Sequence, residues 1–200
     1  MDFESSVIIG VVGQIASGKG ILVNQLTGHF NFKSFSLSSI VHAELEKEEN
    51  SKFTRQTLQD IGDKLRREYG DDILARRLYE VIKGQKTGHI VIEGIRNPGE
   101  IEFFKKNSNF ILIGVKANRG LRFNRVLSRG KEWDPKTYND FLKVDRRDLG
   151  VRQNKSGQQV GKCLAYCDYV ITNNKDVKDF EKKVEKLFIH KLFPGEIIGK

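Results

Sequence analysis

The stretch Val7–Leu26 reads VIIGVVGQIASGKGILVNQL and begins with an apolar run rich in β-branched residues. Such a run predicts a buried strand. From Gly13 to Lys19 the chain matches the spacing G-x-x-x-x-G-K, and apolar residues at helical spacing follow the lysine. A strand, a glycine-containing loop, a lysine and a helix in this order form the context that a phosphate-binding P-loop requires.

The predicted loop would hold a polyphosphate through its backbone and its lysine. Gly13 and Gly18 let the backbone bend so that several N–H groups point inward, the helix N-terminus adds a partial positive charge, and Lys19 adds a full one. The alternative is a glycine-rich turn that merely joins a strand to a helix, and the lysine and the flanking elements argue against it. The match departs from the usual motif at Gly20, where a Ser or Thr hydroxyl commonly binds Mg²⁺.

Length and composition predict one compact domain spanning residues 1–200. A chain of 200 residues with 38% apolar content can bury a substantial core. It has no apolar run long enough to span a bilayer, and residues 1–6 are acidic and polar, unlike a secretory signal. Cys163 and Cys167 have no nearby Cys or His to complete a metal site, so we interpret them as core thiols. We therefore expect a cytoplasmic protein that does not bind membranes.

The formal net charge of +9 has two interpretations. Nucleic-acid binding is one of them. However, the Lys and Arg residues are spread over many segments and mixed with 26 acids, and no basic run is interleaved with aromatic residues. Polyphosphate binding together with an ordinary solvated surface explains the charge as well, so we do not expect nucleic acid as a partner.

Short buried strands alternate with helical patterns along the chain. Strands are expected at 7–12, 30–37, 89–93, 110–115 and 168–171. Helices are expected to follow Lys19 and at 40–49, 54–69, 73–82, 98–106, 118–129, 135–148, 157–166 and 176–192. Ser38 and Ser39 would cap the second of these helices, and Asp134 would cap the helix that starts at Pro135. The alternation predicts an α/β fold in which helices cover both faces of a parallel sheet.

The carboxyl ends of parallel strands meet at one edge of a sheet, and ligands bind there. Besides the P-loop, the loops at 93–97, 118–119 and 172–174 would converge at this edge. Glu93 ends an apolar strand in the manner of a Walker B segment and could hold Mg²⁺ directly or through water. Arg96, three residues later, suits a bidentate grip on a phosphate, although a surface arginine is the alternative.

A series of arginines follows in the second half of the chain. They are Arg119, Arg122, Arg125, Arg129, Arg146 and Arg147. Because arginines that close over a transferred phosphoryl group stabilise its charge, we expect two or three of the six to reach the site. The segment GKEWDP at 130–135 breaks the helical pattern and could begin a mobile lid. His42 is interpreted as a surface residue without a catalytic role.

These segments resemble the P-loop kinases of the nucleoside monophosphate kinase and dephospho-coenzyme A kinase group, over nearly the whole chain. GQIASGKG (13–20) is similar to the adenylate-kinase loop, where Gly also follows Lys. IEGIRNPGEIEFF (92–104) looks like the segment after strand three in deoxynucleoside monophosphate kinases and archaeal adenylate-kinase-related proteins, and CDYVITNN (167–174) resembles a segment near the end of dephospho-coenzyme A kinases. GQQVGKCLAYCDYVITNN (157–174), with GIRNP, also resembles the P-loop domain of two-domain deoxycytidylate deaminase proteins. No deaminase signature is present in this sequence.

The resemblance implies a three-layer P-loop NTPase fold with a five-stranded parallel sheet, a helical lid at about 130–157, ATP and Mg²⁺ as cofactors, and a small nucleotide as substrate. It implies ATP binding by Gly13, Gln14, Ile15, Ala16, Ser17, Gly18, Lys19, Gly20, Ile21, Arg125 and Asn173. It implies acceptor binding by Ser38, Arg55, Arg67 and Arg96. It implies catalytic roles for Lys19, Glu93, Arg129 and Arg146, with Glu93 also at the metal.

The chain departs from these kinases at several positions. Adenylate kinases have Thr where this chain has Ile21, and an Arg is usual near the place of His42. Ser36, Ser38 and Ser39 lie where dephospho-coenzyme A kinases carry an acid, which favours a nucleotide acceptor. Two functions stay open. One is an ATP-dependent small-molecule kinase. The other is a regulatory module that binds a nucleotide without phosphotransfer, which the missing hydroxyl after the lysine favours.

Overall fold

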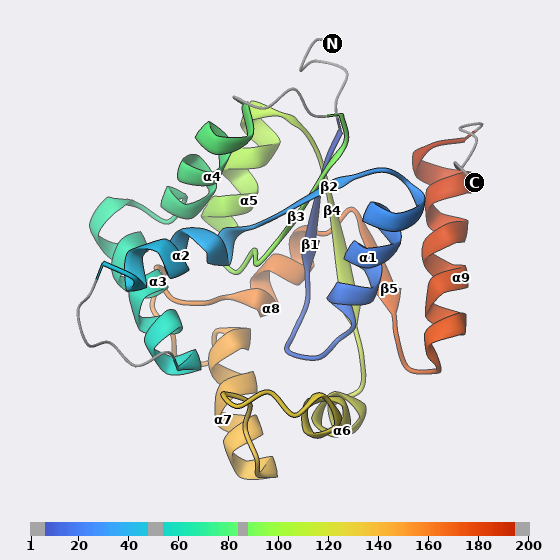
Figure 1. Cartoon of the computed structure of the whole chain (residues 1–200). Helices are drawn as coiled ribbons and strands as arrows, with labels where there is room; N and C mark the ends of the chain where they lie inside the picture. The colour runs from blue at the N-terminus through green and yellow to red at the C-terminus, as the bar shows by residue number, and fades with distance from the viewer. Residues whose placement is uncertain (1–6, 48–53, 84–87, 195–200) are drawn as a thin grey trace.

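The computed structural model describes residues 7–47, 54–83 and 88–194 and confirms the predicted α/β fold. Five parallel strands form one sheet in the order β2-β3-β1-β4-β5, with helices on both faces (Figure 1). They are β1 (Val7–Val12), β2 (Lys33–Ser36), β3 (Ile90–Glu93), β4 (Asn109–Lys116) and β5 (Tyr169–Thr172). The central strand β1 is the one that leads into the glycine loop.

Helices surround this sheet, and most of them form two outer layers on its faces. They are α1 (Lys19–His29), α2 (Leu37–Leu45), α3 (Arg55–Tyr69), α4 (Ile73–Lys83), α5 (Pro98–Asn107), α6 (Arg119–Arg129), α7 (Tyr138–Leu149), α8 (Val160–Cys163) and α9 (Val177–Leu187). Successive residues of a strand point to opposite faces, and β1 shows this clearly. Ile8 is buried in a cluster with α2, α3, α4, α5 and α8, whereas Ile9 is buried with α1 and α9. The near-continuous apolar sequence of β1 is therefore explained by burial on both faces.

The helices α6 and α7 belong to neither outer layer. They lie together beyond the carboxyl ends of the strands, at the bottom of Figure 1. Val126 of α6 and Phe141 of α7 are fully buried and form a third, small core with Ile15 of the glycine loop. The pair of helices is thus packed directly on the predicted phosphate site.

Three predicted element boundaries are wrong, each for a local reason. The N–H of Phe32 donates to Leu26 O, so residues 30–32 continue the end of α1 instead of starting β2. Ser36, not Ser38 or Ser39, is the N-cap of α2, and its hydroxyl accepts from the Ser38 N–H. This cap starts the helix directly at the end of the strand. The helix predicted to reach residue 49 ends at Leu45, and positions 48–53 lie outside the described residues.

A fourth boundary, the start of α7, is also wrong. Asp134 does not cap this helix, which begins at Tyr138 with Thr137 as its N-cap; the Thr137 side chain accepts from the Asp140 N–H at 3.1 Å. Asp134 is buried and bound to arginines instead. Residues 130–137 therefore form a loop between α6 and α7. The Asp134 carboxylate in this loop binds arginines instead of capping a helix.

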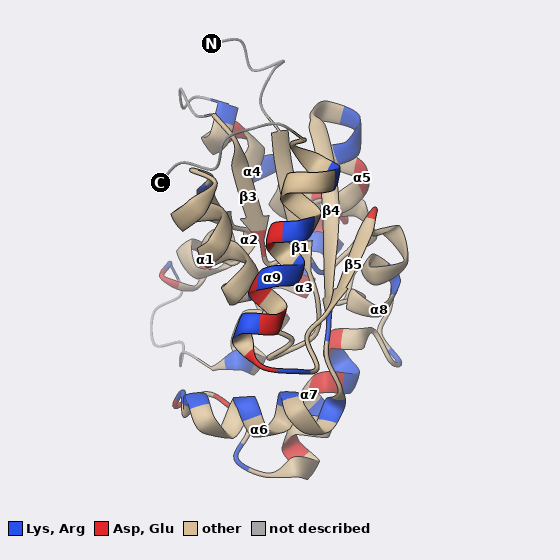
Figure 2. Ribbon diagram, turned by 90° about the vertical axis from the view of Figure 1, so that its right-hand side faces the viewer, with Lys and Arg blue, Asp and Glu red and all other residues tan. Residues whose placement is uncertain are grey.

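The last part of the chain has shorter helices than predicted. The segment 157–166 contains α8 followed by a 3₁₀ turn at Leu164–Tyr166, and α9 continues into a π-helical turn at Phe188–Leu192. Both cysteines are free, as predicted, and burial raises the pKa of the Cys167 thiol to about 12. Within the described ranges no helix has both the length and the apolar character needed to cross a membrane. Basic and acidic residues alternate along α9, in keeping with an ordinary solvated surface (Figure 2).

Candidate active site

The loop between β1 and α1 has a backbone that requires glycine at both ends. A Cβ added to Gly13 would lie 2.4 Å from the carbonyl oxygen of Val115 in β4. Gly18 has φ of 108°, in the left-handed region, and a Cβ there would lie 2.1 Å from Asn173 Nδ2. Both distances are far below ordinary contact, so a larger residue would force the loop open. The geometry explains the two glycines of the motif independently of any ligand.

The loop is held from the far side by the segment after β5. Asn173 is buried, and its Nδ2 donates to the carbonyl oxygen of Ser17 at 2.9 Å. Arg125 of α6 in turn donates through Nη2 to the backbone and side-chain oxygens of Asn173, both at 3.1 Å. The sequence analysis predicted that Arg125 and Asn173 bind ATP. In the structure Asn173 contacts the loop, and Arg125 contacts Asn173 and also donates to the carbonyl oxygen of Lys175, so Asn173 supports the glycine loop from behind.

Lys19 is the first residue of α1, and its ammonium folds back over the glycine loop. Nζ donates to Gly13 O at 2.6 Å and to Gln14 O at 3.0 Å. Burial lowers the pKa of Lys19 to about 8; the negative charge of Asp148 opposes this shift, and the positive charge of Arg96 adds to it. Charges from the loop after β3 and from the ends of α6 and α7 therefore act on this one ammonium group, so the loop after β3 lies beside the glycine loop.

A buried ion pair joins the glycine loop to α6 and α7. Arg122 of α6 donates to both carboxylate oxygens of Asp145 of α7, at 2.6 and 3.0 Å, and both side chains are almost fully buried. The same carboxylate accepts from Gln14 Nε2 at 3.0 Å, and Arg122 Nη1 also donates to Ile15 O at 3.4 Å. A buried pair with two parallel hydrogen bonds fixes geometry strongly. The predicted lid segment therefore contains a helix, α7, that is anchored on the P-loop.

The donors available for a metal are few. Glu93 ends β3 at the edge of the site, where it is partly buried, and Gly20 is exposed and has no hydroxyl. Among the residues that the structure describes, no group of three or more His, Cys, Asp or Glu side chains could hold a metal ion. Mg²⁺ in nucleotide sites needs only one or two carboxylates because phosphates and water complete its shell. The residues present therefore fit a Mg²⁺ ion that arrives with a nucleotide, held by Glu93, better than a resident one.

A cavity of about 240 Å³ lies next to Arg96, and we call it the acceptor cavity because residues that the sequence analysis predicts to bind an acceptor line it. Its lining consists of Leu37, Ser38, Val41, His42, Arg55, Leu58, Gly62, Arg66, Leu74, Gly94, Arg96, Lys131, Trp133 and Gln158. This lining contains five basic or imidazole side chains and no Asp or Glu. A cavity of this kind favours a ligand that is both anionic and partly apolar.

The acceptor cavity contains three of the four side chains predicted to bind an acceptor. Ser38, Arg55 and Arg96 line it, whereas Arg67 is exposed on α3 and does not. Its neighbour Arg66 does, but that guanidinium donates from Nε and Nη2 to the fully buried Glu100 at 2.9 and 2.8 Å. The charge of Arg66 is thus compensated within the protein, and its role in the cavity wall is structural.

The Arg96 guanidinium is held in the cavity by the buried side-chain amide of Gln158. With the Gln158 side chain in the orientation that satisfies its neighbours, its oxygen accepts from Arg96 Nη1 at 2.9 Å and its nitrogen donates to Asp148 Oδ1 at 3.1 Å. No carboxylate contacts the Arg96 guanidinium within the described residues at ion-pair distance. No described carboxylate at this distance therefore neutralises the charge of Arg96, whereas Glu100 neutralises that of Arg66.

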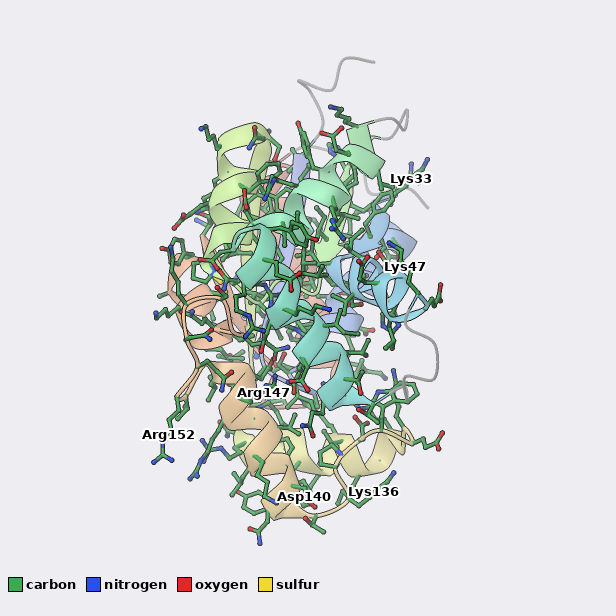
Figure 3. All side chains as sticks on the ribbon, turned by 90° about the vertical axis from the view of Figure 1, so that its left-hand side faces the viewer. Lys33, Lys47, Lys136, Asp140, Arg147 and Arg152 are labelled. Carbon is green, nitrogen blue, oxygen red and sulfur yellow. The ribbon has the colours of Figure 1, made fainter. Side chains whose placement is uncertain are left out.

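The two predicted catalytic arginines lie in different surroundings. Arg129, at the end of α6, donates to Asp134 from Nε at 2.5 Å and from Nη2 at 2.7 Å, and Arg55 donates to the same carboxylate at 3.3 Å. Arg146 is exposed on α7, while its neighbour Arg147 lies at the junction of α7 and α3 (Figure 3). Arg147 pairs there with Asp60 at 2.6 Å. Of Arg129 and Arg146, only Arg129 is joined within the described residues to the acceptor cavity, through the Asp134 carboxylate that it shares with Arg55.

Comparison with known sequences shows which family the chain belongs to. No family model matches the chain. It is 32% identical to a UPF0200 protein of Pyrococcus horikoshii over 185 residues, which cover 90% of this chain and 95% of that protein. The chain belongs to the UPF0200 family. A second UPF0200 protein, of Thermococcus kodakarensis, is 30% identical over 198 residues, which cover 96% of this chain and 99% of the relative.

Solved structures show the fold of this UPF0200 chain. TT1252 from Thermus thermophilus matches it with a TM-score of 0.62 at 16% identity, over 93% of this chain and 98% of that one. A shikimate kinase from Acinetobacter baumannii in complex with shikimate matches with a TM-score of 0.54 at 15% identity, over 96% and 97%. These likenesses confirm the fold of the P-loop kinases, over the full length of the neighbours.

Four residues of the UPF0200 site were missed from the sequence. Asp134 and Asp148 were placed only as helix-end residues, Gln158 was given no role, and His42, which lines the cavity, was placed on the surface. No local pattern could have identified the first three, because each contacts residues far away in the chain.

A larger cavity of about 720 Å³, between α5 and α8, lies away from the glycine loop, and its lining contains both acidic residues and lysines.

Proposed function

We propose that this UPF0200 protein is an ATP-dependent phosphotransferase. It transfers the γ-phosphoryl group of ATP to a nucleoside monophosphate or a related nucleotide-like acceptor, a class that includes dephospho-coenzyme A. The observation that carries the proposal is the position of the acceptor cavity, which is lined by basic side chains and adjoins the P-loop at Arg96, close enough to Lys19 to lower its pKa. Positive charge from two different loops supports phosphoryl transfer between two anionic molecules.

Each residue has a defined task in this proposal. ATP supplies the phosphoryl group, which passes to the acceptor as ADP leaves. The backbone N–H groups of the glycine loop bind the phosphates, and Lys19 exchanges its two loop carbonyls for phosphate oxygens. Glu93 would hold Mg²⁺, which would neutralise negative charge on the phosphates. Arg96 grips the acceptor's anionic group, and Arg129 stabilises charge on the transferred group. Positioning and charge stabilisation of this kind account for most of the catalysis of phosphoryl transfer.

The walls of the acceptor cavity support an acceptor with a flat or apolar body. Leu37, Val41, Leu58 and Leu74 supply apolar surface, and Trp133 supplies an aromatic ring at the lid loop. Binding pockets for small molecules combine such apolar walls with a few polar groups that set orientation. A nucleoside with a single phosphate has both parts, which is why we rank it above a small sugar or acid.

A second function is favoured by one specific observation. Neither Gly20 nor Ile21 offers the hydroxyl that P-loop enzymes use at Mg²⁺. A domain that binds a nucleotide and senses it, without transferring a phosphoryl group, would tolerate this loss. The resemblance to the P-loop domain of deoxycytidylate deaminase proteins agrees with such a regulatory module.

The two functions are separated by turnover. ADP formation from ATP and Mg²⁺ is measured with each of the common ribo- and deoxynucleoside monophosphates and with dephospho-coenzyme A, and ATP binding is measured by calorimetry. ADP that forms only with an acceptor supports the kinase, whereas tight ATP binding without turnover for any acceptor supports the module. The Lys19→Met variant is the control, because it should lose ATP affinity under both functions. Unchanged ATP affinity in this variant would contradict both.

A further inference from the structure

Asp134 is the one carboxylate that contacts both Arg129 and Arg55 in the described part of the chain. Its side chain is only 2% exposed. Arg129, at the end of α6, binds it through two parallel hydrogen bonds, and Arg55, at the start of α3, binds one of the same oxygens. Burial would raise the pKa of Asp134, but the bonds and charges of the two arginines outweigh burial and hold the pKa below its ordinary value. The carboxylate is therefore ionised at neutral pH and joins two separate segments.

The two arginines belong to a larger group of positive charges. The charge of Arg129 acts on Lys19, and the charges of Arg96 and Arg129 act on Arg55. Like charges at such distances repel each other. Side chains as long as arginine would separate into solvent unless an anion held them. In the empty protein, Asp134 is the group that holds two of them in place.

The guanidinium groups keep donors that Asp134 does not use. Arg129 binds it through Nε and Nη2, which leaves Nη1 free of that carboxylate. Arg55 uses Nη2, and its Nε is buried with no hydrogen-bond partner in the described structure. A buried donor without a partner costs free energy, and such a group in a folded protein calls for an explanation. Arg55 lines the acceptor cavity, so an anionic ligand there could supply the partner.

We propose that Asp134 is a positioning residue, which fixes Arg129 and Arg55 relative to each other so that their remaining N–H groups are aligned before the substrates bind. The inference rests on the proposed phosphotransfer. In this proposal Asp134 does not contact substrate and acts only through the two arginines. Charged groups that are already aligned do not have to reorganise when charge develops on the transferred group, so the effect should appear in the catalytic step.

Asp134→Asn tests this, because it keeps the shape of the side chain and removes its charge. We expect kcat to fall about 10- to 100-fold, as for other groups that orient a reacting one, while both KM values change less than about threefold. Asp140→Asn is the matched control: Asp140 follows the same loop, is half exposed, and pairs with Lys143 (Figure 3). Its kcat should equal that of the native protein. An unchanged kcat in Asp134→Asn would overturn the proposal.

A double variant checks that the effect passes through Arg129. If Asp134 acts by positioning this arginine, Asp134→Asn should lower kcat by less than about twofold when Arg129→Gln is already present. Full additivity of the two losses would overturn the proposal. So would tighter ATP or acceptor binding in Asp134→Asn with kcat unchanged, because Asp134 would then be a blocking group that occupies the arginines.

A further readout does not need turnover. Trp133 is the single tryptophan of the chain and precedes Asp134, so its fluorescence anisotropy reports the order of the lid loop. The anisotropy should fall in Asp134→Asn and stay unchanged in Asp140→Asn. If the native protein turns over no acceptor, the proposed function fails, while unchanged anisotropy in Asp134→Asn would contradict the positioning itself.

Asp134→Glu covers the case in which Asp134→Asn does not fold. It keeps the charge but moves the carboxylate by about one methylene, and misplacement of about 1 Å can cost up to about 100-fold in rate. We expect a native melting temperature with a reduced kcat. A native kcat together with native anisotropy would overturn the proposal.

Discussion

The ammonium of Lys19 should make ATP binding depend on pH in the range 7–9. Without ATP, burial lowers the pKa of this group to about 8, and the ammonium donates hydrogen bonds to Gly13 O and Gln14 O. A polyphosphate places several negative charges next to the ammonium and must raise its pKa again. ATP should therefore bind to the protonated form and take up a proton wherever the empty protein has lost one.

The magnitude follows from the pKa of about 8. About nine-tenths of Lys19 is protonated at pH 7, about half at pH 8 and about one-tenth at pH 9. If only the protonated form binds, ATP affinity falls about tenfold between pH 7 and pH 9, or about 1.4 kcal/mol. The stability of the protein without ATP changes with pH in the opposite direction to the ATP affinity. Because the folded pKa lies below the unfolded value of 10.5, this group makes the empty protein more stable as pH rises from about 8 toward 10.5.

Calorimetric titration of ATP, with Mg²⁺ held constant, measures this effect directly. At pH 8 the same titration in two buffers of different ionisation enthalpy should show uptake of about half a proton per ATP bound. The control is Lys19→Arg, whose guanidinium stays charged across this range, so its ATP affinity should be independent of pH between 7 and 9. No proton uptake by the native protein at pH 8 would refute the reasoning, even if ATP binds tightly.

Three other predictions concern the remaining parts of the site. Glu93→Gln should lower kcat or Mg²⁺ affinity about 10- to 100-fold at an unchanged melting temperature, and the reasoning is wrong if the Mg²⁺ dependence of turnover stays the same. Arg96→Lys loses bidentate phosphate binding and should raise acceptor KM roughly tenfold or more while ATP Kd changes little; equal losses for both ligands would indicate a folding defect. Asp145→Asn should lower the free energy of unfolding in urea by about 3–5 kcal/mol because it leaves Arg122 buried without its counter-charge, and replacing both residues by Met should cost much less.

The glycine loop could be predicted from the sequence because its information is local. A strand, two glycines at a fixed spacing and a lysine all lie within one stretch, and parallel pairing then brings the ends of β1 and β3 to the same edge. For that reason Glu93 and Arg96 could be predicted to lie near the loop, and their charges do act on Lys19. The helix boundaries failed where a single side chain decides them, as Ser36 does at the start of α2.

The choice between Arg66 and Arg67 shows a different limit. Both belong to α3, and the sequence analysis predicted that Arg67 binds the acceptor. Gln59, Gly62 and Arg66 share one buried face of the helix, and Arg66 Nη1 lies 3.5 Å from the position of a Cβ on Gly62. A Cβ at Gly62 would make only an ordinary van der Waals contact with the guanidinium, so the glycine gives no signal for the buried arginine. Its partner Glu100 lies 34 residues away and could not be inferred from spacing alone.

The lid was predicted to cover about 130–157, but its parts differ in how they are attached. Residues 130–137 are fixed mainly through Asp134, whereas α7 is anchored by Asp145 to the glycine loop and to Arg122. A buried network of this kind gives no sequence signal, because its members are separated by more than 20 residues. The α7 helix is therefore expected to keep its position when a nucleotide binds.

The hydrogen bond from Asn173 to Ser17 spans 156 residues of the chain, and this sets an order of events during synthesis. A nascent chain carries the whole G-x-x-x-x-G-K segment long before Asn173 has been made. The amide that holds Ser17 in place, and against which Gly18 is packed, arrives only when β5 has been made and has joined β4. The glycine loop thus acquires its final shape only after all five strands of the sheet have been synthesised.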